Sequence, residues 1–346
     1  MGEVTMPLEP RGTGTALVVH AHPDDEVFAT GAATLALGHA GWRVVLRIAT
    51  GGEAAEHPAV GETEARRLRL AKLSRSCELL TIAEYDWLTE PGQWVDRGGA
   101  QAGTLARAQR SDVVDAVRQA LAEVRPALVL TVGSDGLTGH PDHVAMSAAV
   151  REAVRSDKAI SGSTYGARVR AADVAAAHAE LARLLAPAAS EPELQIGSGR
   201  MVGAGAEIAL TEIGLDQSGR AAATADVAGS WIEERRRAAL DVYESGLGTR
   251  PLADVVAGRR RQRRPPGDRH LALTESVAEQ GRLADLVAEQ GRLPDLIAQE
   301  GPLPDLIAQE GSPPDVAQGR RRLGDSVILR AVFDLAGWQR DFFELL

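Results

Sequence analysis

Short apolar runs alternate with longer amphipathic segments along roughly the first 155 residues, and this alternation constrains the fold more than any other feature of the chain. Ala16–Ala21 and Ala127–Val132 are mostly apolar runs typical of buried strands. Between them, segments such as Gly61–Leu80 carry apolar residues at helical spacing. Strands that alternate with helices form parallel sheets flanked by those helices. The pattern therefore predicts an α/β fold with a mostly parallel sheet and flanking helices.

The same reasoning predicts the order of the elements. The expected strands are 16–21, 44–49 and 127–132, with weaker signals near 201 and over 206–213. The expected helices are 27–41, 61–80, a helix that begins at Ser111 and stops before Pro126, 144–155, 171–185, 232–244 and 327–346.

Composition excludes several classes of protein. The single cysteine, Cys77, can close no intrachain disulfide, so a disulfide scaffold is excluded and a cytoplasmic location is expected. A net charge of −10 and 3 % aromatic residues argue against nucleic-acid binding. No apolar run reaches the roughly 18 residues that span a membrane. We therefore expect neither nucleic acid nor a membrane as a partner.

Three regions follow from changes in composition. Residues 14–250 carry the α/β pattern and are expected to form one domain. Residues 251–325 are expected to be an Arg/Pro-rich linker with ten-residue tandem repeats over 278–315, where recurring Gly and Pro oppose a continuous helix. We expect this region to be flexible, with docking through its apolar residues as the alternative. Residues 326–346 are expected to form a terminal helix that packs back on the domain.

Two polar clusters follow apolar strands. His20–Glu26 comes directly after the first strand, and Gly139–His143 follows the strand over 127–132. Ligands of open α/β sheets bind at the carboxyl ends of the strands, so the two loops are expected to converge. Imidazoles with a carboxylate, and a position left open for water, are typical of a catalytic zinc site. The alternative is a purely structural role, because X-Pro-Asp is also ordinary turn chemistry.

These clusters resemble the two signature motifs of the PIG-L/LmbE family of zinc-dependent N-deacetylases. The matching segments are 22–26, His-Pro-Asp-Asp-Glu, and 140–143, His-Pro-Asp-His. The resemblance covers roughly 14–155, including Thr-Gly-Gly-Glu at 50–53, and resumes weakly over 234–247. It implies a Rossmann-like, LmbE-like fold.

The resemblance also implies a role for each motif residue. Three residues are expected to bind Zn²⁺: His22, Asp25 and His143. Asp24 would be the general base for the attacking water, which suits a carboxylate next to a metal ligand. His140 would stabilise the oxyanion or protonate the leaving amine, and Asp142 would orient His140.

Other positions bear on the substrate. Arg69 and Glu53 are expected to bind substrate, although a solvated helix face is the alternative for Arg69. Lys72 stands where the family usually has a glutamate, and Tyr243 where it commonly has a histidine. Thr138 replaces the tyrosine of the mycothiol-cleaving branch, which argues against that branch.

Three further polar or reactive residues have structural explanations. Glu26 is expected to stabilise the start of a helix through the helix dipole. His20 is expected to be a buried residue at the end of its strand, and Cys77 a packed and unreactive thiol.

The resemblance therefore implies an enzyme. We expect a metal-dependent amide hydrolase that removes an N-acetyl or other N-acyl group from a small amino-sugar conjugate of the N-acetylglucosamine type. One alternative is an amidase that acts on a thiol-sugar conjugate or a secondary metabolite. Another is a binding module that keeps the metal without catalysis, although the presence of Asp24 and His140 argues against it.

Overall fold

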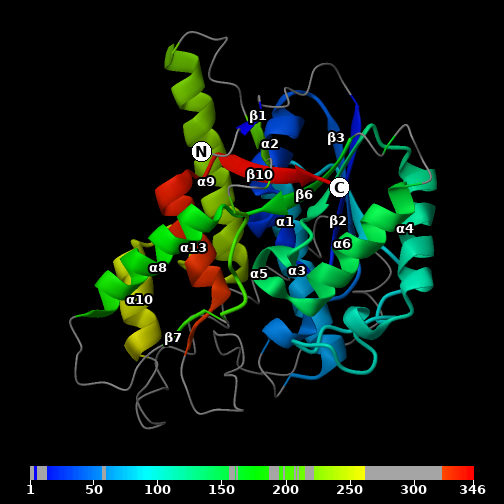
Figure 1. Ribbon diagram of the computed structural model, residues 1–346, viewed down its shortest axis with the longest axis horizontal. Coiled ribbons are helices and arrows are strands. Elements are labelled where there is room, and N and C mark those ends of the chain that lie inside the picture. The colour runs from blue at the N-terminus through cyan, green and yellow to red at the C-terminus, as the bar shows by residue number, and fades with distance from the viewer. Residues whose placement is uncertain are drawn as a thin grey trace.

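The computed structural model describes residues 4–5, 14–56, 60–155, 160, 163–186, 195–197, 199–205, 208, 210–214, 222–261 and 322–346. An eight-stranded sheet lies at its centre, and helices cover both faces of this sheet (Figure 1). This arrangement confirms the predicted α/β fold with a mostly parallel sheet and flanking helices.

The strand order places the two motif-bearing strands side by side. From edge to edge the strands are β1 (Val4–Thr5), β8 (Leu210–Gly214), β10 (Arg340–Leu345), β6 (Thr164–Arg168), β5 (Leu128–Val132), β2 (Thr15–His20), β3 (Arg43–Ile48) and β4 (Glu84–Trp87). Neighbours are parallel except β10, which runs antiparallel to β6 and β8. Because β2 and β5 are parallel neighbours, the loops that follow them lie at one edge of the sheet.

The sheet separates two apolar layers. Along β2, Ala16 and Val18 pack into one layer and Leu17 and Val19 into the other, and all four are fully buried. Successive side chains of a strand point to opposite faces. A central strand covered on both faces is therefore apolar at every one of these positions, which explains the continuous run in the sequence.

Helices complete both layers. The Leu17 layer is covered by α4 (Arg110–Val124) and α6 (Pro141–Val154). The Ala16 layer is covered by α2 (Gly31–His39), α3 (Glu62–Leu79), α8 (Ala171–Leu185), α9 (Ala222–Tyr243), α10 (Leu252–Arg261) and α13 (Asp325–Ala336). The shorter elements are α1 (Asp25–Phe28), α5 (Gly136–Gly139), two 3₁₀ turns at Glu53–Ala55 and Leu105–Arg107, and the pair β7 (Gln195–Ile196) and β9 (Arg322–Leu323). None of the described helices combines the length and apolarity that crossing a membrane requires.

The C-terminal segment departs from the expected terminal helix. The helix ends at Ala336, and Arg340–Leu345 forms strand β10 inside the sheet. Gly337 adopts a positive φ of 108°, and helices commonly stop at a glycine with positive φ. Phe342 and Phe343 then pack into separate apolar clusters, as alternate residues of a strand do. The prediction of one helix over 327–346 was therefore wrong beyond Ala336.

The expected linker over 251–325 is also partly ordered. It begins with α10, whose Val256 is buried in the core, and its last residues enter β9 and the start of α13. The tandem repeats over 278–315 lie outside the described residues.

Smaller differences concern helix and strand bounds. The helix expected over 27–41 is two helices, α1 and α2, and α1 begins within the first polar cluster. The strand expected near 201 is a single bridge between Arg170 and Ala204. Strand β4 was not predicted, because Glu84–Trp87 is short and at most half-buried.

Candidate metal centre

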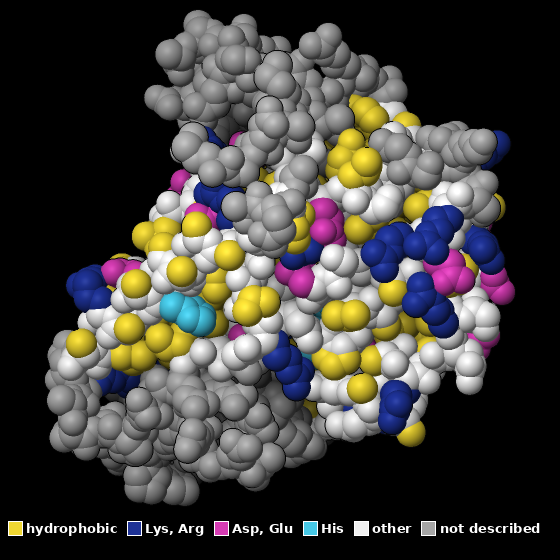
Figure 2. Space-filling view, viewed as in Figure 1, with side chains coloured by type: hydrophobic (Ala, Val, Ile, Leu, Met, Phe, Trp, Pro, Cys, Tyr) yellow, Lys and Arg dark blue, Asp and Glu magenta, His cyan; other side chains and the backbone are white. Residues whose placement is uncertain are grey.

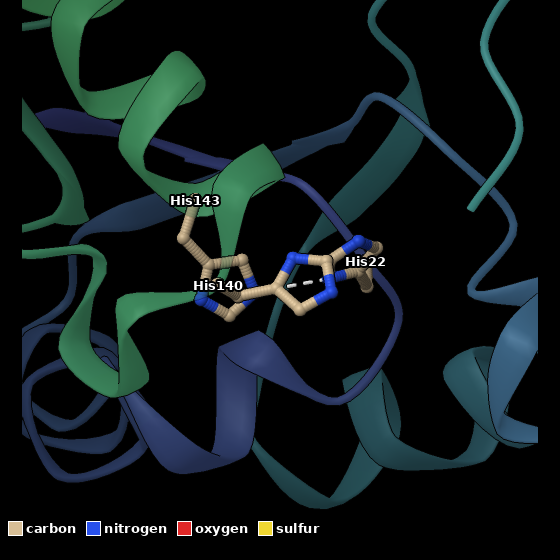
Figure 3. Close-up of side chains that lie close together, drawn as sticks. All are labelled: His22, His140 and His143. Carbon is tan, nitrogen blue, oxygen red and sulfur yellow. Dashed lines mark hydrogen bonds between the residues drawn. The ribbon is translucent and has the colours of Figure 1, made fainter. Parts of the chain in front are cut away.

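The two polar loops meet at the carboxyl ends of β2 and β5, as expected. His22 lies in the loop between β2 and α1, whereas His140 and His143 lie at the start of α6. The three rings point toward one another across this edge of the sheet (Figure 3). Their centroids are 4.8 to 5.0 Å apart.

The three expected metal ligands converge on one point. Nδ1 of His22 lies 2.9 Å from Nε2 of His143. Oδ1 of Asp25 lies 3.0 Å from the same Nε2, and Oδ2 of Asp25 lies 3.7 Å from Nδ1 of His22. All three side chains are buried. The structure thus brings together a carboxylate and two imidazoles from loops 121 residues apart.

The outer ring nitrogens define the tautomers of the two histidines. Nδ1 of His143 lies 3.0 Å from the carbonyl oxygen of Gly136, which can only accept, so this nitrogen carries the proton. Nε2 of His22 lies 3.4 Å from a carboxylate oxygen of Asp142, which favours a proton there as well. Both facing nitrogens then present lone pairs to each other. Such an arrangement is stable only with a cation or a shared proton between them.

The distances among the candidate ligand atoms are compatible with a divalent metal. Zinc binds nitrogen and oxygen at about 2.0–2.1 Å, so its ligand atoms lie about 3.3 Å apart. Nδ1 of His22 lies 2.9 Å from Nε2 of His143, and the two carboxylate oxygens of Asp25 lie 3.0 Å from His143 and 3.7 Å from His22, close to this value. His140 also offers a nitrogen within 4.8 Å of the other two imidazoles. The donor set therefore fits a divalent metal.

The charges around the site favour a cation. Burial acts to lower the pKa of His22, but three nearby carboxylates raise it to about 10: Asp96, Asp142 and Asp25. Burial opposes ionisation of Asp25, yet the neighbouring His143 holds the pKa of this carboxyl well below its usual range. In the absence of metal, the site is therefore expected to hold a proton on His22 that a metal must displace.

His140 has a different environment from the two facing histidines. It precedes α6 as its N-cap, and its Nδ1 accepts a hydrogen bond from the backbone N–H of Asp142 at 3.3 Å. Burial, reinforced by the neighbouring His22 and His143, lowers the pKa of His140 to about 4. Neutral His140 therefore carries its proton on Nε2 and presents an N–H donor.

Asp142 contacts His22, contrary to the expectation that it orients His140. Its carboxylate accepts from the backbone N–H of Ala106 at 2.7 Å and lies 3.4 Å from Nε2 of His22. Only the backbone N–H of Asp142 reaches His140 among the hydrogen bonds of the described residues. The reason is geometric: α6 begins at Pro141 and directs the buried Asp142 side chain toward β2.

Asp24 occupies a strained turn at the start of α1. Its φ is 112°, which is unusual for a residue other than glycine, and such strain clusters at functional sites. Burial raises the pKa of the Asp24 carboxyl, while Arg69 acts to lower it. Arg69 donates from Nη2 to Oδ2 of Asp24 at 2.8 Å.

The two expected substrate-binding residues are both engaged within the protein. Arg69 is buried and also donates to the carbonyl of Pro23. Glu53 is buried and accepts from Nε of Arg66 at 2.8 Å and from the backbone N–H of Asp96 at 2.9 Å. The solvated helix face considered for Arg69 is wrong, because its side chain is only 4 % exposed.

Sequence reasoning missed Asp96. Its Oδ2 lies 3.9 Å from Nε2 of His22, and the loop that carries it is fixed by Glu53. Asp96 stands in a Gly-rich stretch without a recognisable motif, so the sequence offers no signal for it.

Glu26 has more partners than the helix dipole expected for it. It is fully buried and accepts from Oγ of Ser76 at 2.6 Å, from the hydroxyl of Tyr243 at 2.7 Å and from the backbone N–H of Asp24 at 2.9 Å. Burial raises the pKa of Glu26 to about 7. Glu26 therefore connects α3 and α9 to the turn at Asp24.

The expected burial of His20 and of Cys77 is confirmed. His20 is fully buried at the end of β2, with Nε2 2.9 Å from Oγ1 of Thr30, and burial lowers its pKa to about 4. Cys77 is buried in the core.

A family comparison agrees with this geometry. Residues 17–154 match the PIG-L family model, described as GlcNAc-PI de-N-acetylase. Residues 17–154, the PIG-L segment, are therefore similar to this family. The PIG-L segment contains both motif loops and every expected site residue, whereas Tyr243 and strand β10 lie outside it.

Similar sequences match a comparable share of the chain. A protein of Kineococcus radiotolerans named 1D-myo-inositol 2-acetamido-2-deoxy-alpha-D-glucopyranoside deacetylase is 36 % identical over 148 residues, which is 37 % of this chain and 41 % of the relative. A protein of the same name numbered 2, from Saccharopolyspora erythraea, is 33 % identical over 151 residues, 40 % of this chain and 55 % of the relative. The chain thus spans about half the length of the relatives it matches.

Solved structures of other proteins superpose on part of this chain. The zinc inhibited form of teicoplanin deacetylase Orf2 has a TM-score of 0.42 at 17 % identity, covering 67 % of this chain and 85 % of that chain. The N,N'-diacetylchitobiose deacetylase from Pyrococcus horikoshii has a TM-score of 0.33 at 22 % identity, covering 40 % and 49 %.

Proposed function

We propose that this protein is a zinc-dependent hydrolase that removes an N-acetyl group from a small amino-sugar conjugate of the N-acetylglucosamine type. The observation that carries the proposal is the approach of Nδ1 of His22 to Nε2 of His143, at 2.9 Å, beside the Asp25 carboxylate. The names of the relatives support the class of substrate, since two of them are deacetylases of a 2-acetamido sugar joined to inositol.

The roles of the residues follow from their contacts. His22, Asp25 and His143 would hold the zinc, which when bound lowers the pKa of a water molecule to about 7 and polarises an amide carbonyl. Asp24, held by Arg69, would accept the proton of the attacking water. His140 would donate its Nε2 proton in a hydrogen bond to the developing oxyanion.

Asp142 and Asp96 would act through His22. Carboxylates that bind the outer nitrogen of a ligand histidine fix its tautomer and increase its basicity. Asp142 and Asp96 both lie on the Nε2 side of His22, at 3.4 and 3.9 Å. This placement leaves Nδ1 for the metal.

Metal content and amine release test the proposal together. The purified chain is expected to hold about one zinc, and chelation is expected to abolish amine release from N-acetylglucosamine or its inositol conjugate. His143→Ala should lose both the metal and the activity, whereas His39→Ala, altered on α2 beside Trp231, should keep both. If the His143→Ala protein held as much zinc as the unaltered protein, His143 would not be a metal ligand.

The same assay separates the alternatives. Release of amine only from acylated glycopeptides or thiol-sugar conjugates would favour the amidase. Retention of zinc without turnover of any of these amides would favour a binding module.

A further inference from the structure

The C-terminal strand β10 reaches the loop that carries the second motif. Glu344 on β10 accepts from the backbone N–H of Ser134 through Oε1 at 2.5 Å, although 210 residues separate the two. Its Oε2 accepts from Nη1 of Arg168 on β6 at 2.8 Å. Both Glu344 and Arg168 lie outside the PIG-L segment.

Arg168 holds the same loop from a second side. Its side chain is 6 % exposed, and its Nη1 also donates to Oγ of Ser134 at 3.0 Å. Its Nε lies 3.1 Å from Oδ2 of Asp135. The stem of Arg168 crosses directly over Gly133, where an added Cβ would lie 2.2 Å from Cδ of Arg168. Glycine at 133 therefore permits this close approach.

The loop that Glu344 and Arg168 contact leads to the carbonyl of Gly136, which orients the His143 ring. Asp135 accepts from the backbone N–H of Leu137 through Oδ1 at 2.9 Å, and Leu137 has a positive φ of 60°. Gly136 lies between these two residues in the chain. Its carbonyl oxygen accepts a hydrogen bond from Nδ1 of His143 at 3.0 Å. A strained turn of this kind persists only when its surroundings hold it.

We propose that Glu344 and Arg168 are positioning residues for His143, so that the C-terminal strand contributes to metal binding without touching the metal. Glu344 and Arg168 hold the loop at Ser134 and Asp135 in place. The position of this loop determines the turn at Gly136. The carbonyl of Gly136 in turn sets the tautomer and the direction of the His143 ring. The inference rests on the proposed role of His143 as a ligand. Outer partners of ligand histidines typically contribute 10- to 100-fold to metal affinity.

Zinc titration of the full chain against a chelating dye tests the inference. Glu344→Gln keeps the shape of the side chain but removes its charge, and we expect zinc affinity to fall about tenfold, at the low end of that range. Arg168→Lys replaces a forked contact with a single one and should weaken zinc in the same direction. The matched control is Glu212→Gln on β8, which removes a carboxylate 3.5 Å from Arg340 of the same β10. It should bind zinc as the unaltered chain does.

Hydrogen exchange separates local positioning from general stability. In the metal-free chain, Glu344→Gln should speed exchange over 133–144 and leave β2 and β3 unchanged. Unaltered zinc affinity in both Glu344→Gln and Arg168→Lys, or an equal loss in Glu212→Gln, would overturn the inference while leaving the proposed hydrolase intact. If the unaltered chain did not bind zinc, both this inference and the proposed hydrolase would be overturned, whatever the hydrogen exchange rates show.

Discussion

The guanidinium of Arg69 lies 2.8 Å from the carboxylate of Asp24, 45 residues earlier in the chain. Arg69 also donates to the carbonyl of Pro23, and its guanidinium lies 4.8 Å from the ring centroid of Tyr243. Both hydrogen bonds come from one nitrogen, Nη2, and they link the guanidinium to successive residues of the strained turn at Asp24. Arg69 therefore positions the carboxylate that we propose accepts the proton of water.

Replacement of Asp24 should remove turnover without removing metal. Asp24→Asn keeps the size of the side chain and an oxygen that can accept from Arg69, but it cannot take a proton at neutral pH. We expect turnover to fall by roughly 10² to 10⁴ with zinc content unchanged. Steady-state kinetics with elemental analysis measures both. Asp115→Asn, on α4 with a side chain 70 % exposed, is the control and should behave as the unaltered chain.

Arg69→Lys distinguishes positioning of Asp24 from contact with substrate. A lysine keeps the charge but loses the planar guanidinium that lies over the Tyr243 ring, so a misplaced base should lower kcat by roughly 10- to 100-fold with little change in KM. Arg75→Lys on the same helix, with a side chain 48 % exposed, should have no effect. A raised KM at unchanged kcat would instead restore the substrate-binding role expected from the family resemblance.

The buried ion pair between Arg236 and Asp341 should be costly to break. The pair joins α9 to β10 at 2.8 Å, and both side chains are at most 5 % exposed. Burial raises the pKa of Asp341 and lowers that of Arg236, so desolvation outweighs their attraction. Asp341→Asn leaves the Arg236 charge buried and unpaired, which typically costs about 3–5 kcal/mol. Urea unfolding measures this loss.

An exposed pair provides the comparison for that experiment. Glu180 and Arg183 form an ion pair on α8 with side chains 29 % and 68 % exposed. Glu180→Gln should leave the unfolding midpoint unchanged, because exposed pairs contribute little. Equal midpoints for Asp341→Asn and Glu180→Gln would contradict the importance of the buried pair.

Cys77 should be unreactive in the folded protein. Burial raises the pKa of its thiol well above the ordinary value, and the thiolate is the reactive form. Ellman's reagent at pH 8 should therefore label Cys77 only after denaturant is added. Rapid labelling of the native chain would show that α3 opens on the time scale of the assay.

Local features of the sequence predicted much of the fold and the convergence of the two polar loops. Buried strands such as β2 and β5 are apolar at almost every position, and polar residues follow directly where these strands end. The family motifs supplied the roles of His22, Asp25 and His143, which the structure brings within 2.9 to 3.7 Å of one another. Strand β10 escaped prediction because its two adjacent aromatic residues, Phe342 and Phe343, interrupt the alternation of apolar and polar residues that indicates a strand.

The sequence by itself determined the alternation of strands and helices and the position of both polar loops, because periodicity and residue type are properties of neighbouring residues. Only the tertiary structure decided which partner each polar side chain meets: Arg69 meets Asp24, Asp142 meets His22, and Glu344 meets Ser134. These pairs depend on the order of strands in the sheet and on the packing of helices against it. Such long-range contacts leave no pattern in the local sequence, since the paired residues lie between 45 and 210 positions apart.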